Sequence, residues 1–113
     1  MKILLAVDGS DYTKKMLAYL STHDELFSAS NSYTLLTVQP QLPARARSVV
    51  GKEAVEAFQR EESEKVLGPV TKFLVRHGID AKTIAKVGHA GEIISKTADS
   101  GKFDLVVMGS HGH

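Results

Sequence analysis

The stretch that decides the fold is residues 103–113, Phe103-Asp104-Leu105-Val106-Val107-Met108-Gly109-Ser110-His111-Gly112-His113. Four consecutive apolar residues run directly into a glycine-spaced segment, which is typical of a buried strand that ends in a loop. Residues 3–10 repeat this layout, because their apolar run ends in Asp8-Gly9-Ser10. If the two strands are neighbours in a parallel sheet, Asp8 and Gly109 face each other across a crevice at the carboxyl ends of the strands, where such sheets bind ligands.

Strand and helix patterns alternate through the rest of the chain. Strand patterns cover 3–7, 33–38, 79–87 and 105–108, and helical patterns cover 11–23, 53–77 and a segment that opens at 88–92 and closes at Gly101. Residues 44–52 have no clear period and are expected to form a long connection. Gly68-Pro69 is expected to kink or restart the second helix, because proline lacks a backbone donor and clashes with the preceding turn.

This alternation predicts an α/β fold, an open and doubly wound Rossmann-like parallel sheet with helices on its faces. Residues 3–7 and 105–108 form the most apolar strand patterns and are expected at the centre of the sheet. Residues 79–87 carry lysines and alternate poorly, which favours an edge strand. The strand order 3-2-1-4 fits these patterns and puts the topological switch point between the first and fourth strands.

Length and composition limit the possible functions. With 113 residues, 42% of them hydrophobic and 24% charged, the chain has the balance of one small globular domain. A net charge of +1 argues against a nucleic-acid partner, and the apolar runs are too short to cross a membrane. The absence of cysteine excludes disulfides and thiolate metal sites. Because a strand pattern follows Met1-Lys2 with no signal peptide before it, a cytoplasmic protein is expected.

Several motifs, taken together, resemble the universal stress protein family from end to end. The matching segments are Ile3–Ser10, Leu35–Val38, Gly88–Ile93 and Asp104–Gly112. The resemblance implies a single domain over residues 1–113 with the fold of the adenine nucleotide alpha hydrolases. It also implies a small, cytoplasmic and usually homodimeric protein induced by stress. Many members of the family bind ATP and others do not.

The resemblance also implies a site. In the ATP-binding members an aspartate after the first strand contacts the adenine or ribose, and a valine at the end of the second strand packs near the adenine. Asp8 and Val38 match these positions. The family's glycine motif runs Gly, two residues, Gly, nine residues, then Gly followed by Ser or Thr, and Gly109 and Gly112 match its first half. The implied ligand is ATP, with or without Mg²⁺, and the candidate nucleotide-binding residues are Ala6, Val7, Asp8, Val38, Met108, Gly109, Ser110, His111 and Gly112.

The family pattern continues past residue 113 with a phosphate-wrapping loop, a fourth helix and a fifth strand that usually pairs across the dimer. Against this pattern the chain looks truncated within the glycine motif. Such a chain lacks the loop that wraps the phosphates, and its fourth strand has an exposed apolar edge.

Each of these residues also has an interpretation without a ligand. A bare G-x-x-G is common in strand-ending turns, and Asp8 can cap the helix that follows Gly9. Gly88 and Gly91 repeat the spacing but fit the start of a helix. Basic side chains of the connection could reach phosphates or form a solvated segment, namely Arg45, Arg47 and Lys52.

No catalytic constellation stands out. The sequence contains neither a P-loop nor a nucleophile elbow, and His111 and His113 have no identifiable third partner for zinc or nickel. One interpretation is a stress sensor or regulator that binds an adenine nucleotide. Its enzyme activity would be at most weak ATP hydrolysis or self-phosphorylation. The alternative is a non-nucleotide-binding stress protein that acts as a dimerisation or protein-interaction module. On the first interpretation, Gly109→Val is expected to abolish binding without unfolding the chain.

Overall fold

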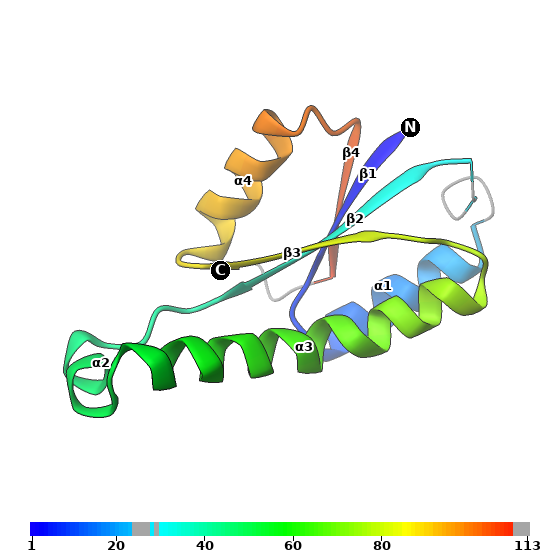
Figure 1. The fold of residues 1–113 in the computed structure, drawn as a ribbon. Coiled ribbons are helices and arrows are strands. Elements are labelled where there is room, and N and C mark those ends of the chain that lie inside the picture. The colour runs from blue at the N-terminus through cyan, green and yellow to red at the C-terminus, as the bar shows by residue number, and fades with distance from the viewer. Residues whose placement is uncertain (24–27, 29, 110–113) are drawn as a thin grey trace.

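A computed structural model describes residues 1–23, 28 and 30–109. Its elements are β1 (Lys2–Val7), α1 (Asp11–Ser21), β2 (Ser32–Gln39), α2 (Ala44–Val50), α3 (Lys52–Arg76), β3 (Lys82–Val87), α4 (Ala90–Ser100) and β4 (Leu105–Gly109) (Figure 1). Within the described residues, four strands form one parallel sheet in the order β3-β2-β1-β4. The predicted α/β fold and the predicted strand order are confirmed.

The sheet is covered on both faces, which makes three layers (Figure 1). Ile3, Leu5 and Val7 of β1 pack in a cluster with α1 and α3. Leu4 and Ala6 point the other way and pack with Ile94 of α4. All five of these β1 residues are at most 2% exposed. A strand that is buried on both faces has to be apolar at every position, which explains the uninterrupted apolar run in the sequence.

The two outer strands differ from each other. β3 forms one edge, as predicted, and its Lys82 and Lys86 are exposed. β4 pairs with β1 and forms the other edge of the described sheet, so the prediction that it is central is wrong. Its Val106 and Val107 are only half-buried, and Met108 is 45% exposed.

The segment between β2 and α3 also differs from its prediction. Residues 44–50 form the helix α2 instead of an irregular connection. None of its residues is buried, and a helix that buries no face needs no apolar stripe by which it could be recognised. α3 then runs from Lys52 through Pro69 to Arg76 as one helix, so the predicted restart does not occur. No helix among the described residues has the length and apolarity needed to cross a membrane.

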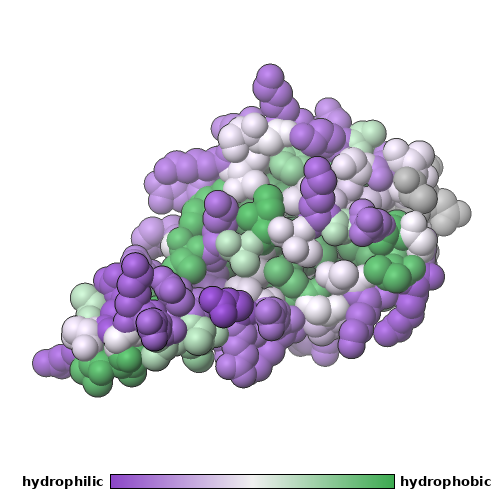
Figure 2. Space-filling model, in the orientation of Figure 1, coloured by the Kyte–Doolittle hydropathy of each residue, from purple (hydrophilic) through white to green (hydrophobic). Residues whose placement is uncertain are grey.

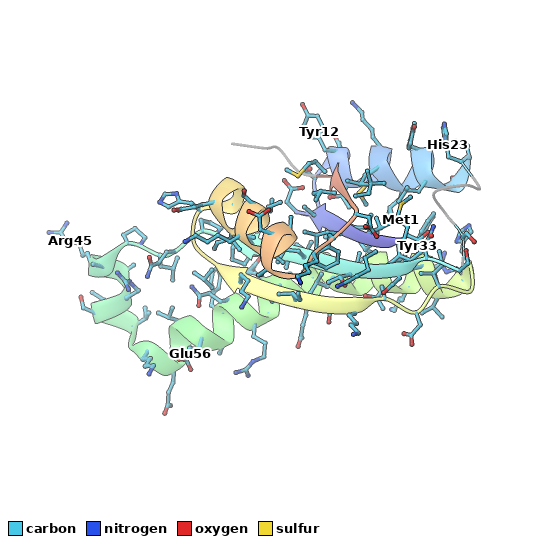
Figure 3. The ribbon with its side chains drawn as sticks, turned by 90° about the horizontal axis from the view of Figure 1, so that it is seen from above. Met1, Tyr12, His23, Tyr33, Arg45 and Glu56 are labelled. Carbon is cyan, nitrogen blue, oxygen red and sulfur yellow. The ribbon has the colours of Figure 1, made fainter. Side chains whose placement is uncertain are left out.

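α1 begins as predicted and turns one narrow face to the core. Ser10 is its N-cap and accepts a hydrogen bond from the backbone N–H of Tyr12 at 3.2 Å. The Tyr12 side chain is 47% exposed and points away from the sheet (Figure 3). The inner face starts instead with Thr13 and continues with Met16 and Leu20, all buried and three or four residues apart.

The packing of α3 on the sheet can be tested with two adjacent residues. Leu74 is fully buried in the core, whereas Val75 is 60% exposed. Leu74→Ala should lower the free energy of unfolding by about 2–5 kcal/mol, because it removes buried methyl groups and leaves a cavity. Val75→Ala, the control, should change it by less than about 0.5 kcal/mol. Urea unfolding followed by circular dichroism measures both, and equal losses would contradict the packing of α3.

Candidate functional site

The carboxyl ends of β1 and β4 lie side by side, as predicted from the sequence. The parallel register pairs Ala6 with Met108 and Val7 with Gly109. Asp8 follows directly after this last pair, at the edge of the sheet. The structure therefore brings five of the predicted residues together. Ser110, His111, Gly112 and His113 lie outside the described residues.

Thr13 joins these two strand ends, and sequence reasoning missed it. Its Oγ1 accepts hydrogen bonds from the backbone N–H of Asp8 at 3.1 Å and of Gly9 at 3.2 Å. The same oxygen contacts the carbonyl oxygen of Gly109 and, at 3.3 Å, the Asp8 Oδ1. A hydroxyl has one hydrogen to donate, and the contact with Gly109 is the shorter of the two. We call this arrangement of Thr13, Asp8, Gly9 and Gly109 the Thr13 junction.

The Thr13 junction is shielded from water, since Thr13 is only 3% exposed. A buried donor or acceptor that loses its partner keeps its full desolvation penalty. The bonds of this one hydroxyl therefore hold the turn after β1 against the end of β4. A threonine inside a helical pattern carries no signal of such a role.

Asp8 has a local structural role. Its Oδ1 accepts a hydrogen bond from the backbone N–H of Ser10 at 2.9 Å, and its side chain is half-buried. This bond tightens the turn that leads into α1, but Asp8 does not cap the helix as one interpretation expected, because the N-cap is Ser10. A carboxylate oriented in this way can also accept hydrogen bonds from a ligand.

Three predicted residues, Ala6, Val38 and Met108, share the α4 face of the sheet, whereas Val7 lies on the face of α1 and α3. Register places Leu36, Ala6 and Met108 in one row across β2, β1 and β4. Val38 lies two positions beyond Leu36 and packs, half-buried, with the residues under α4. Ala6 and Val7 are at most 2% exposed, so their side chains belong to the core. Val38 and Met108 are thus the apolar side chains of this edge that a ligand can cover.

Gly109 is a glycine for a reason that the sequence did not reveal. A Cβ at this position would lie 2.8 Å from the Met16 Sδ and 3.1 Å from the Thr13 Cα. α1 therefore rests directly on the backbone of β4. Any larger residue has to push α1 away, so the expectation that Gly109→Val leaves the chain folded is contradicted by this packing.

The second glycine pair serves the fold. Gly88 has a φ of +145°, and a Cβ there would lie 2.7 Å from the Ile93 Cδ1. α4 begins two residues later at Ala90. The interpretation of Gly88 and Gly91 as the start of a helix is therefore confirmed. Among the described residues, no group of three or more His, Asp or Glu side chains could hold a metal ion.

The Thr13 junction can be tested with two variants of one residue. Thr13→Val keeps the shape of the side chain but removes the hydroxyl, so the N–H groups of Asp8 and Gly9 lose their acceptor. We expect a loss of about 1–3 kcal/mol in the free energy of unfolding and faster hydrogen exchange at both amides. Thr13→Ser keeps the hydroxyl and should stay near the wild type. Unchanged exchange at both amides in the valine variant would disprove the junction.

Comparison with known proteins agrees with this architecture. The model of the universal stress protein family matches residues 1–113. Universal stress protein Slr1230 from Synechocystis sp. is 30% identical over 112 residues. These residues cover 99% of this chain but 33% of the relative, so the chain spans about a third of the relative's length.

Two solved structures share the fold. The hypothetical protein MJ0577 is 28% identical with a TM-score of 0.77, and the match covers 99% of this chain and 76% of that one. A universal stress protein family protein from Arabidopsis thaliana, solved with AMP bound, is 18% identical with a TM-score of 0.71 and matches over 99% and 78% of the two chains. Because the family model matches every residue, the chain belongs to the universal stress protein family.

Proposed function

We propose that this chain binds an adenine nucleotide, ATP in the first instance, at the carboxyl edge of the sheet between the ends of β1, β2 and β4. The observation that carries the proposal is the Thr13 junction, which holds Asp8 beside the end of β4 at the topological switch point. The family member solved with AMP bound supports an adenine nucleotide as the ligand.

Each side chain has a proposed role. The Asp8 carboxylate accepts hydrogen bonds from the ribose hydroxyls or the adenine amino group. Val38 and Met108 provide apolar surface for the adenine ring. The resemblance to the family assigns the ribose and phosphates to Gly109, Ser110, His111 and Gly112. Mg²⁺ would arrive with the phosphates, because the described residues offer no cluster of ligands for it.

The proposed role is sensing or regulation rather than turnover. Among the described residues, Ser10 and Thr13 place hydroxyl groups beside Asp8, and both groups already serve the fold. The Ser10 Oγ caps α1, and the Thr13 Oγ1 forms the Thr13 junction. Both hydroxyls are therefore already engaged: that of Ser10 accepts from the N–H of Tyr12, and that of Thr13 contacts the Gly109 carbonyl oxygen and the Asp8 carboxylate. The function that this arrangement supports best is binding of a nucleotide that alters the conformation at the carboxyl ends of β1 and β4.

The test compares two aspartates by calorimetric titration with Mg-ATP, AMP and adenosine. Asp8→Asn keeps an acceptor for the N–H of Ser10 but loses the negative charge. We expect it to weaken nucleotide binding by about tenfold to a hundredfold, since a hydrogen bond to a charged group contributes about 1.5–3 kcal/mol. Asp11→Asn is the control, because Asp11 is exposed in the first turn of α1.

The pattern of affinities separates the outcomes. Similar affinities for ATP and adenosine would mean that the nucleoside carries the binding, and tighter binding of ATP would mean that the chain also holds phosphates. An absence of binding for all three, or equal losses in the two variants, would refute the proposed site.

A second candidate function, self-association as a homodimer, rests on a different surface. An apolar groove of about 300 Å³ lies between α2 and α3 and is lined by Leu42, Val50, Ala54, Val55 and Phe58. Phe58 is 49% exposed, and Val49 beside the groove is 79% exposed. Figure 2 shows hydrophobic residues gathered on the tip that α2 forms. An exposed apolar surface of this kind is typical of protein interfaces.

The dimer can be tested by light scattering after size-exclusion chromatography. The wild type should elute with the mass of two chains, and Phe58→Ser with the mass of one, because the change places a hydroxyl in the apolar contact. Glu61→Ser, a change at an exposed polar position of the same helix, should stay dimeric. A monomeric wild type would contradict this second candidate.

A further inference from the structure

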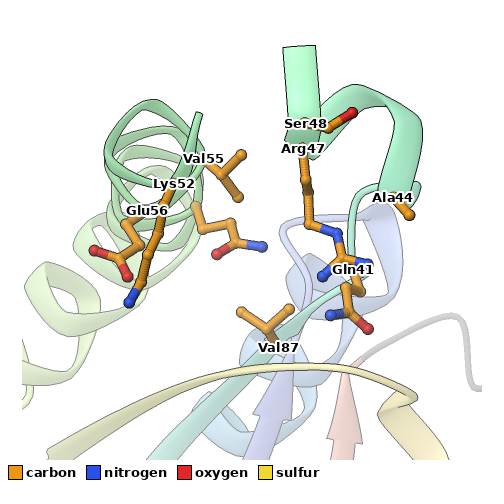
Figure 4. A pocket seen from close by; sticks show the side chains of 9 residues that line it. Gln41, Ala44, Arg47, Ser48, Lys52, Val55, Glu56 and Val87 are labelled. Carbon is orange, nitrogen blue, oxygen red and sulfur yellow. The ribbon is translucent and has the colours of Figure 1, made fainter. Parts of the chain in front are cut away.

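A separate cavity lies between α2, the first turns of α3 and the end of β3 (Figure 4). Its volume is about 610 Å³, which falls in the range of small-molecule sites. None of the described candidate residues for the nucleotide lines it. The cavity is therefore distinct from the proposed nucleotide site at Asp8.

The shape of the cavity follows from the reversal between two helices. Gly51 ends α2 and begins α3 with a φ of +88°, a conformation that residues with a Cβ rarely adopt. Its N–H donates to the carbonyl oxygen of Arg47 at 3.0 Å. α2 thus folds back beside α3, and Val55 and Val87 line the space with apolar surface. Val55 is 6% exposed, so this part of the wall is anchored in the fold.

Two cations line the cavity, Arg47 on α2 and Lys52 on α3, and the Lys52 side chain runs beside that of Glu56 (Figure 4). Neither forms an ion pair within 4.0 Å in the part of the chain that the structure describes. Glu56 also lines the cavity, so the lining carries two positive charges and one negative charge. An anion in the cavity would gain attraction from the Arg47 guanidinium, which no carboxylate pairs within 4.0 Å among the described residues.

We propose that this cavity binds a small organic anion. Its apolar body covers Val55 and Val87, and its acidic group meets the guanidinium of Arg47. The Ser48 hydroxyl, which also lines the cavity, offers a further polar contact. A bare inorganic anion fits this lining poorly, because it leaves the apolar part uncovered.

Binding in this cavity should also fix the position of α2. Because α2 buries none of its own residues, its packing on α3 contributes little stability. A ligand that contacts both helices stabilises the conformation in which α2 is packed on α3. Slower hydrogen exchange over residues 44–50 is therefore a second readout of binding.

The test uses two fluorescent probes that differ in charge, 8-anilinonaphthalene-1-sulfonate and its neutral analogue N-phenyl-1-naphthylamine. The wild type should bind the sulfonate more tightly than the neutral probe. Arg47→Gln should weaken binding of the sulfonate by about tenfold, the size expected for a lost charge-assisted hydrogen bond, and leave the neutral probe unchanged. Arg45→Gln is the matched control, because Arg45 belongs to the same helix but does not line the cavity and points away from it (Figure 3).

Several results would overturn the proposal. Equal effects of the two arginine variants would mean that general surface charge attracts the sulfonate. Displacement of the sulfonate by adenosine, which carries no charge, would put it in the proposed nucleotide site at Asp8, and its loss in Phe58→Ser would put it in the apolar groove. Unchanged exchange over residues 44–50 when the sulfonate binds would likewise exclude the cavity between α2 and α3. Protection of those residues, with a loss confined to Arg47→Gln, supports the site.

Discussion

The structure depends on the two parallel ladders that β1 forms, with β2 on one side and β4 on the other. The side chains of residues 3–7 alternate between the two hydrophobic clusters. β1 therefore joins the layer of α1 and α3 on one face of the sheet to the layer of α4 on the other. Because both ladders are parallel, their carboxyl ends open at the same edge of the sheet. The candidate site is the place where the central strand and its neighbours stop together.

The parts of the fold that could be predicted are those whose burial leaves a pattern. The place of β1 could be predicted because a strand that is buried on both faces is apolar at every position, as residues 3–7 are. The place of β3 could be predicted because an exposed edge strand tolerates lysines. α2 could not be predicted, since it buries nothing and so has no apolar period. Tyr12 shows the opposite limit, because its ring fits the helical spacing of Met16 and Leu20 and is nevertheless exposed.

For the candidate site, the sequence was enough to bring Asp8 and the end of β4 together, but not to show what holds them. Thr13 acts through the carbonyl of a residue 96 positions later in the chain, and no local pattern announces such a contact. Gly109 was assigned to ligand approach, whereas the structure shows α1 resting on it through Met16 and Thr13. Contacts of Asp8 and Val38 with a nucleotide stay predictions.

The ladder between β1 and β4 also has a consequence for synthesis of the chain. The backbone N–H of Lys2 donates to the Asp104 carboxylate at 2.7 Å, across 102 positions of sequence. On the ribosome, β1 therefore emerges long before its β4 partner exists. During that interval one side of the most apolar strand offers open backbone groups, a surface that chaperones or a second nascent chain can occupy. The sheet can therefore be completed only after β4 has been translated.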